Sequence, residues 1–262
     1  MPGRYIDLRG HQVHTFEWAN NGDALVLMHG GLSQTDHWDY TVLPAVESNF
    51  HPFGYDRTGH GYTGDQEGSM HFEFQCAEAI AYLEDVVKEP AHLIGHSDGA
   101  IISLMVAMKR PDLVKSVISF GGLFHFSGTL PMPDFDGNIS EEDRAEYAVT
   151  SPDAPETQEA KIRKMFSIWY SEPEFSVADV AKIQCPVLVL VGDDDVISHH
   201  HTIELFESLP QGQLAVMPGT SHIAHKEKPE LFQMLVSSFL NDLSYPQTKM
   251  PMRRSQINSQ SE

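Results

Sequence analysis

Cysteine is scarce in this chain of 262 residues, which contains only Cys76 and Cys185. The two are far apart and show no metal-type spacing, so the sequence indicates neither a disulfide framework nor a zinc site. Long apolar runs are missing too. No stretch reaches the roughly 18 to 20 apolar residues of a membrane helix, and the start lacks the apolar core of a secretion signal. We therefore expect a soluble cytoplasmic protein with no membrane partner.

Basic residues are also few, with 17 Lys and Arg against 37 Asp and Glu and a formal net charge of −20. Such a charge repels the phosphates of nucleic acids and attracts cations. We expect no nucleic-acid partner. A solvated acidic surface with no further role would have the same composition.

Apolar runs alternate with helical patterns along most of the chain. A hairpin and a buried strand are predicted within the first 30 residues, and the central runs are apolar on both faces, which favours a mostly parallel sheet covered by helices on two sides. In all, eight strands are predicted. The further strands are predicted at 51–56, 91–96, 114–122, 186–193 and 213–219, and the helices at 37–47, 73–87, 99–109, 200–208 and 229–243.

Residues 123–180 interrupt this alternation, because they are rich in proline and acidic residues and contain no run typical of a central strand. We predict a helical lid insertion over the carboxyl ends of the strands, where open α/β sheets bind ligands. The core domain then consists of residues 1–122 and 181–243. The polar, proline-broken stretch 244–262 is predicted to be a disordered tail.

Ser97 stands in the motif G-x-S-x-G, between Gly95 and Gly99. The motif follows a predicted strand and precedes a predicted helix, as a strained strand-to-helix turn requires. This turn would expose the hydroxyl at a helix amino terminus, where the backbone N–H of Asp98 faces any oxyanion that forms. The alternative is a turn residue without a catalytic role.

A serine nucleophile needs a histidine base and a carboxylate that orients the histidine. The strand at 213–219 leads through a glycine turn to His222, with His225 as a rival three residues later. The strand at 186–193 leads into Asp193, Asp194 and Asp195, of which any could supply the carboxylate.

Five segments in order resemble the α/β-hydrolase superfamily along nearly the whole chain: LVLMHGGLSQTDHW, YDRTGHGYT, GHSDG, VGDDD and PGTSH. The resemblance implies that fold and a Ser97, Asp195 and His222 triad. It also implies an oxyanion hole formed by the backbone N–H groups of Gly31 and Asp98, with Leu32 as the alternative to Gly31. The elbow GHSDGA is similar to that of valacyclovir-hydrolase-like members, although His96 replaces their tryptophan.

Substrate contacts are predicted from the residue types around this site. The Asp98 carboxylate could bind the ammonium group of an amino ester or could merely favour the positive end of its own helix. Nine acidic residues against one basic residue between Asp134 and Glu159 would favour cationic or neutral substrates. Aromatic residues after the third predicted strand and in the insertion could line the pocket: Trp38, Phe124, Phe126, Phe166 and Trp169.

These features predict a serine hydrolase that needs no cofactor or metal and cleaves a small or medium carboxylic ester, with a lactone or an amino ester among the candidates. The run His199, His200 and His201 is not expected to bind a metal, because consecutive helical residues point in different directions. The alternative function is a small-molecule receptor on a hydrolase scaffold with little turnover. The sequence leaves the oligomeric state open.

Overall fold

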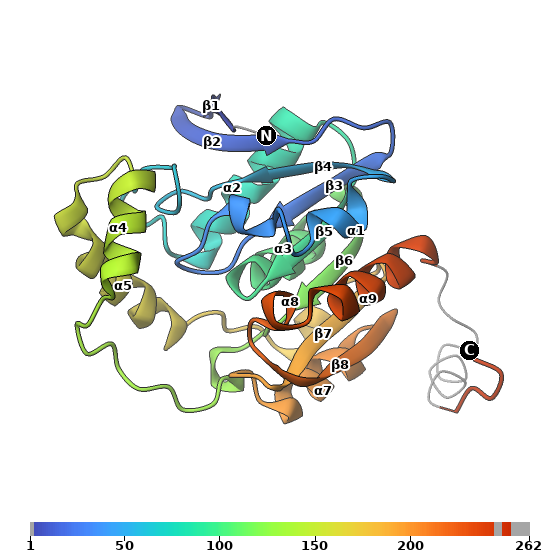
Figure 1. Ribbon diagram of the computed structural model, residues 1–262. Coiled ribbons are helices and arrows are strands. Elements are labelled where there is room, and N and C mark those ends of the chain that lie inside the picture. The colour runs from blue at the N-terminus through green and yellow to red at the C-terminus, as the bar shows by residue number, and fades with distance from the viewer. Residues whose placement is uncertain (1–2, 244–247, 253–262) are drawn as a thin grey trace.

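Eight strands form one open sheet in the computed structural model, which describes residues 3–243 and 248–252 (Figure 1). The strand order is β1-β2-β4-β3-β5-β6-β7-β8. The pairs β1 with β2 and β2 with β4 are antiparallel and the others are parallel, so the predicted fold class is confirmed. The strands are β1 (Arg4–Leu8), β2 (His11–Glu17), β3 (Asp23–Met28), β4 (Phe50–Tyr55), β5 (Ala91–His96), β6 (Val114–Phe120), β7 (Val187–Asp194) and β8 (Gly212–Ser221).

Helices cover both faces of the sheet because alternate residues of its central strands point to opposite sides. Val26 and Met28 of β3 contribute to the apolar core on one face, while Leu25 and Leu27 contribute to the core on the other. The first core is completed by α2 (Phe72–Tyr82), α3 (Asp98–Lys109) and α7 (His199–Ser208). The second is completed by α1 (Leu43–Val46), α8 (Ala224–Glu227) and α9 (Pro229–Asn241).

Two predicted helices differ from the observed ones. The segment 37–47 forms a short 3-10 turn, η1 (Thr35–Trp38), and then the single-turn helix α1, whose second residue is Pro44. Proline has no backbone N–H to bond the carbonyl of Tyr40, so a continuous helix through Pro44 is disfavoured, whereas proline is tolerated in the first turn of α1. The segment 73–87 begins as α2 and continues as the wider π-helical turn η2 (Leu83–Val87).

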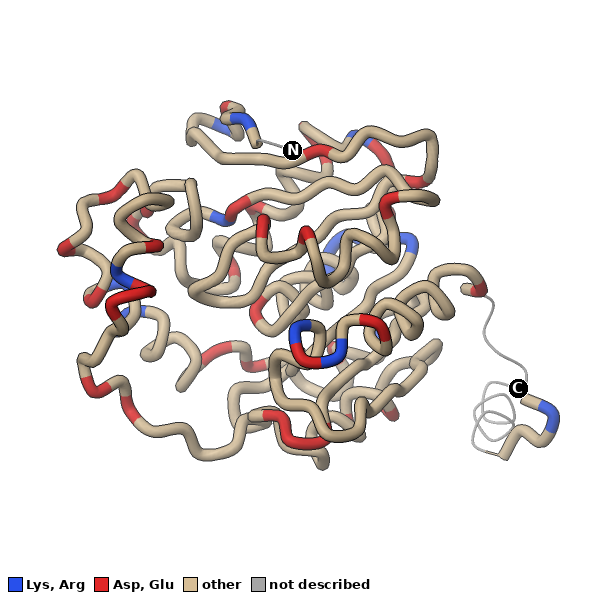
Figure 2. Tube along the Cα trace, viewed as in Figure 1, with Lys and Arg blue, Asp and Glu red and all other residues tan. Residues whose placement is uncertain are grey.

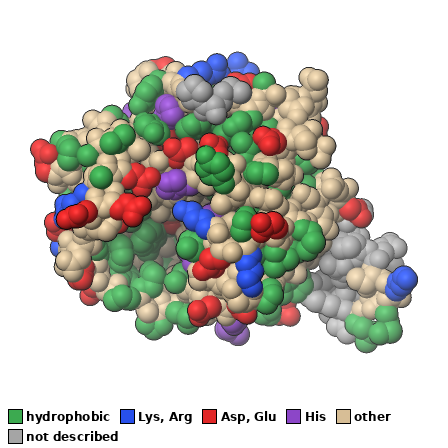
Figure 3. Space-filling model, viewed as in Figure 1, with side chains coloured by type: hydrophobic (Ala, Val, Ile, Leu, Met, Phe, Trp, Pro, Cys, Tyr) green, Lys and Arg blue, Asp and Glu red, His purple; other side chains and the backbone are tan. Residues whose placement is uncertain are grey.

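The segment 123–180 is helical where it is regular, and we call it the insertion. Among the described residues of this segment there is no strand, only two isolated bridges. Acidic residues are frequent on the part of the insertion at the left of the view in Figures 2 and 3. The predicted tail 244–262 lies for the most part outside the described residues. The helices of the insertion are η4 (Phe126–Gly128), α4 (Glu141–Thr150), η5 (Pro155–Thr157), α5 (Gln158–Trp169) and α6 (Val177–Val180), and the turn η3 (Pro111–Leu113) precedes β6.

Candidate active site

Ser97 occupies the sharp turn between β5 and α3 with φ 53° and ψ −117°, a region that residues other than glycine rarely adopt. The turn requires close approach of the strand and the helix. A Cβ atom on Gly95 would lie 2.2 Å from the carbonyl oxygen of Gly99, and one on Gly99 would lie 2.0 Å from that of Met28. The two glycines of the motif are therefore required by packing, and Ser97 is held at the amino end of α3.

A continuous chain of hydrogen bonds joins Ser97 to the ends of β7 and β8. His222 follows β8, and its Nε2 lies 2.9 Å from Ser97 Oγ. His222 Nδ1 lies 2.7 Å from Asp195 Oδ1. The Asp195 side chain is fully buried, and the same oxygen accepts a hydrogen bond of 3.0 Å from the backbone N–H of Ile197. Since a carboxylate accepts at this distance, His222 carries its proton on Nδ1 and presents Nε2 as an acceptor to the Ser97 hydroxyl.

The rival residues from the sequence lie elsewhere. The Asp193 carboxylate accepts a hydrogen bond of 3.0 Å from the backbone of Thr220, and two such backbone bonds hold its pKa below the ordinary range. Asp194 is exposed and belongs to β7. Burial lowers the pKa of His225 to about 3, so this side chain is neutral at physiological pH, and it stacks on Trp38 with 5.8 Å between ring centroids.

His96 supports the base from behind. Its Nε2 donates to the backbone carbonyl of His222 across 2.8 Å, and its ring stacks on Phe120 at 4.7 Å. Burial holds the pKa of His96 well below its usual value, so the ring is neutral. This contact fixes the chain at His222 rather than supplying a second base.

The loop after β3 lies against Ser97. A Cβ atom on Gly30 would be 3.5 Å from the Cβ atom of Ser97, and one on Gly31 would be 2.4 Å from Asp98 Oδ2. A side chain at Gly31 would displace Asp98 or Trp169, and Gly31 lines the same cavity as Ser97. The backbone N–H of Asp98 is one of the unsatisfied amides at the start of α3. Leu32, the alternative, has a left-handed backbone and lines a second cavity rather than the one over Ser97.

A cavity of about 290 Å³ opens over Ser97, His222 and Asp98. No Lys or Arg belongs to its lining among the residues that the structure describes. Burial raises the pKa of Asp98, whose Oδ1 accepts a hydrogen bond of 2.9 Å from Trp169 Nε1, while Oδ2 has no hydrogen-bond partner. The rest of the lining is mainly apolar: Ile101, Leu123, Met132, Val196, Ile197 and Ile223.

Glu172 also lines this cavity, and the sequence analysis did not identify it. Its carboxylate accepts a hydrogen bond of 3.0 Å from the backbone of Phe72 at the start of α2, and it contacts His71 Nδ1 at 2.5 Å. The insertion brings this residue to the site. No local pattern around Glu172 distinguishes it from the other acidic residues of the insertion.

The aromatic residues predicted to line the pocket separate into two groups. Trp169 lines the cavity over Ser97, but the other four do not belong to its lining. Trp38 packs against His225, Phe124 stacks on His201 and Phe126 stacks on His125, while Phe166 lines a second cavity.

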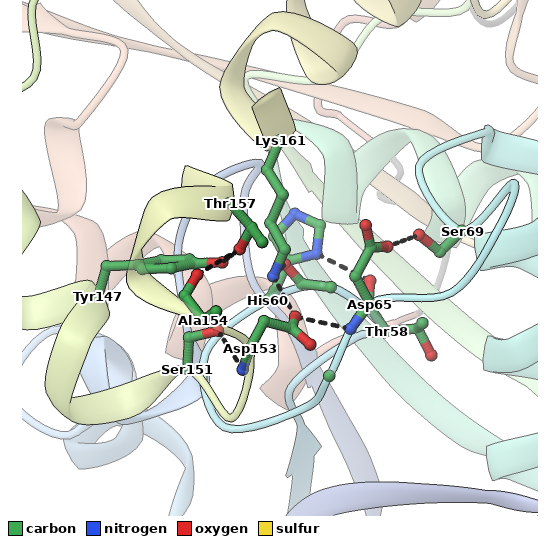
Figure 4. A network of polar contacts seen from close by, with 12 residues as sticks. Thr58, His60, Asp65, Ser69, Tyr147, Ser151, Asp153, Ala154, Thr157 and Lys161 are labelled. Atoms are coloured by element: carbon green, nitrogen blue, oxygen red, sulfur yellow. Dashed lines mark hydrogen bonds and ion pairs between the residues drawn. The ribbon is translucent and has the colours of Figure 1, made fainter. Parts of the chain in front are cut away.

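The second cavity, of about 310 Å³, lies between the insertion and the loops after β3 and β4. Beside it, Lys161 of α5 forms an ion pair of 2.6 Å with Asp153, and the same carboxylate accepts a bond of 2.9 Å from the backbone of Asp65 (Figure 4). The Lys161 side chain is only 7% exposed. This network attaches the insertion to the segment that follows β4.

The parallel sheet, the serine at the strand-to-helix turn and the contacts of that serine with a histidine and a buried aspartate define the class of the protein, an α/β hydrolase. The chain belongs to the alpha/beta hydrolase family, whose family model matches residues 25–232. Among the described residues, no helix is both long and apolar enough to span a bilayer.

Relatives along nearly the whole chain are hydrolases. The chain is 24% identical over 252 residues to (E)-2-((N-methylformamido)methylene)succinate hydrolase of Acinetobacter baylyi, covering 87% of this chain and 94% of the relative. It is 20% identical over 263 residues to the serine hydrolase BPHL of Mus musculus, covering 90% and 85%. A crystal structure of a hydrolase from Pseudomonas aeruginosa superposes with a TM-score of 0.74 and 18% identity, covering 92% of this chain and 98% of the other.

Proposed function

We propose that the protein is a serine hydrolase that cleaves a small or medium carboxylic ester through an acyl-enzyme and needs no cofactor. The observation that carries this proposal is the chain of contacts from Ser97 Oγ to His222 Nε2, at 2.9 Å, and from His222 Nδ1 to Asp195, at 2.7 Å. The Mus musculus relative bears the name serine hydrolase, which agrees with it.

In the first half of the reaction, Ser97 Oγ attacks the ester carbonyl carbon while its proton passes to His222 Nε2. The carbonyl π electrons move to oxygen, and the backbone N–H groups of Gly31 and Asp98 stabilise the resulting oxyanion. Collapse expels the alkoxide, which takes the proton from His222 and leaves an ester on Ser97. Water then repeats these steps with His222 as base, releases the carboxylic acid and restores Ser97.

The charges around the cavity favour neutral or cationic esters. The described lining contains the carboxyl groups of Asp98 and Glu172 and no Lys or Arg side chain to bind a substrate carboxylate. Asp98 Oδ2 is buried without a hydrogen-bond partner, which supports an amino ester, because an ammonium group is the partner that a buried carboxylate favours. The Acinetobacter baylyi relative is named for a succinate derivative, and we do not extend that substrate to this chain.

Turnover of p-nitrophenyl esters, together with fluorophosphonate labelling, tests this function. Wild type should be labelled and active. Ser97→Ala should lose both properties, and Ser238→Ala should keep both, because Ser238 is exposed on α9. A folded wild type that is neither labelled nor active on neutral, anionic and amino-acid esters would refute the proposal. Stoichiometric binding of an ester without turnover would instead support the alternative function, a small-molecule receptor on a hydrolase scaffold.

A further inference from the structure

Arg57 is a fully buried arginine directly behind the loop that borders Ser97. It lies in the segment after β4 and is 0% exposed. Its guanidinium donates to two successive carbonyl oxygens of the β3 loop, from Nη1 to His29 O and from Nη2 to Gly30 O, the latter at 3.1 Å. Burial of a charged group is costly, so a side chain in this position needs partners that offset the loss of water. Here these partners are backbone carbonyls rather than a carboxylate in direct contact.

His29 supplies a second donor to the carbonyl oxygen of Gly30. The backbone N–H of Arg57 donates to His29 Nε2 at 3.1 Å, which places the ring proton on Nδ1. His29 Nδ1 then donates to Gly30 O across 2.7 Å. Burial and the adjacent Arg57 charge hold the pKa of His29 well below its usual value, so the neutral tautomer persists. The Gly30 carbonyl is therefore bound by two donors on one side.

The peptide group that follows Gly30 transmits this constraint to the active site. Its carbonyl oxygen belongs to Gly30 and its N–H belongs to Gly31. Only the Glu172 to Pro173 bond is cis among the described residues, so the Gly30 to Gly31 bond is trans. In a planar trans peptide the oxygen and the hydrogen point in opposite directions. Fixing the oxygen toward Arg57 thus turns the Gly31 N–H away from Arg57, on the loop that borders the Ser97 cavity.

We propose that Arg57 is a positioning residue for the oxyanion hole, which aims the Gly31 N–H and makes it a stronger donor. Two donors on a carbonyl oxygen polarise the whole peptide group and strengthen the hydrogen bond that its N–H can give. Arg57 makes its hydrogen bonds to backbone carbonyls and not to Ser97 or His222, and it acts through the Gly30 to Gly31 peptide. This inference rests on the proposed function, since it assigns a role in stabilising the oxyanion of that reaction.

A trifluoromethyl ketone provides the direct readout. Ser97 Oγ adds to its carbonyl carbon, the serine proton passes to His222, and the former carbonyl oxygen becomes the hemiketal oxygen that occupies the oxyanion hole. With a carbon-13 label at this carbon, a titration followed by NMR gives the pKa of the hemiketal hydroxyl. That pKa falls when the oxyanion is stabilised, and it does not follow global stability.

We expect Arg57→Met to raise this hemiketal pKa by about one unit, which is a tenfold loss of oxyanion stabilisation. On ester substrates, kcat should fall about 10- to 100-fold, while KM changes less than about threefold. Removal of a whole oxyanion donor lowers kcat by a similar or larger factor. Arg57→Lys keeps the charge but reaches fewer carbonyls, so its values should lie between those of wild type and Arg57→Met. Arg110→Met, a variant of a surface arginine in an ion pair with Asp112, should match wild type.

The outcomes separate this inference from the proposed function. If wild type forms no adduct and is not labelled by a fluorophosphonate, the proposed function fails. If wild type forms the adduct and a folded Arg57→Met shows the same hemiketal pKa, the inference alone is overturned. A parallel loss of affinity for the corresponding carbinol, which forms no oxyanion, would also overturn it. If Arg57→Met is not recovered folded, Arg57→Gln takes its place with the same expected shift.

Discussion

Replacing Asp98 by asparagine tests whether its carboxylate selects amino esters. Asparagine keeps the shape of the side chain and an oxygen that can accept the Trp169 N–H, but it loses the charge. One carboxylate oxygen is occupied by Trp169 and the other is buried without a hydrogen-bond partner, so an ammonium group that reaches it gains one charge-assisted hydrogen bond. Such a bond contributes about 1.5 to 3 kcal/mol net. This corresponds to a loss of about 10- to 150-fold in kcat/KM.

The assay compares two substrates that differ only in the amino group, valine p-nitrophenyl ester and p-nitrophenyl 3-methylbutyrate. Asp98→Asn should lose activity on the first and keep activity on the second within about threefold, since only the first substrate makes the ammonium contact. In wild type, the preference for the valine ester should disappear as the pH falls through the raised pKa of Asp98. Equal losses on both esters, or no loss on either, would refute the reasoning.

The same variant has a defined effect on stability. The folded-state pKa of Asp98 is raised by burial, so the unfolded chain releases this proton at a lower pH than the folded chain does. The stability linked to the proton is complete below the unfolded pKa and is lost as the pH rises through the folded pKa. Thermal unfolding should show that Asp98→Asn gains stability relative to wild type as the pH rises from the unfolded-state pKa of Asp98 to its raised folded-state pKa. A constant difference between the two proteins would contradict a raised pKa for Asp98.

Three further substitutions test the structural basis of the site. Asp195→Asn should lower kcat about 10⁴-fold in the ester assay, whereas Asp193→Asn should stay within about threefold; similar losses in both would contradict the assignment of the acid. Gly99→Ala should lower the free energy of unfolding by about 3 kcal/mol in urea titrations, because its Cβ would lie 2.0 Å from a backbone oxygen, whereas Gly64→Ala, with 3.4 Å to its nearest neighbour, should be near neutral. Asp153→Ala leaves the ammonium of Lys161, whose side chain is 7% exposed, without its ion pair, so urea unfolding should show a loss of about 3 kcal/mol; an unchanged midpoint would show that the pair does not anchor the insertion.

The central strands, Ser97 and His222 could be predicted because each depends on local signals, whereas the choice of Asp195 among three neighbouring aspartates came from the family resemblance. A buried strand leading to Ser97 and a glycine turn leading to His222 are both visible within a few residues of sequence. The structure brings these two residues and Asp195 into hydrogen-bond contact, while their catalytic roles stay a prediction. The division into a core domain and a lid also stays a prediction.

The pocket could not be predicted in the same way, because it depends on how the insertion packs against the core. Trp169, the last residue of α5, reaches the site through its bond to Asp98. Lys161, on the same helix, forms the ion pair with Asp153. Trp169 and Asp98 are 71 positions apart in the sequence, and Asp153 also binds the backbone of Asp65, 88 positions away. Phe124 and Phe126 have the residue type of a pocket lining, but they stack on His201 and His125. An aromatic residue fits a core and a pocket equally well, so residue type alone does not choose between them.

The left-handed backbone of Ser97 sets stability against activity at a single position. A residue other than glycine held at such angles costs of order 1 to 3 kcal/mol, and every folded copy of the protein carries this cost. Glycine would relieve the strain and abolish the nucleophile. Selection for thermal stability alone would therefore favour glycine at this position, and on the proposed function it is turnover that maintains the serine.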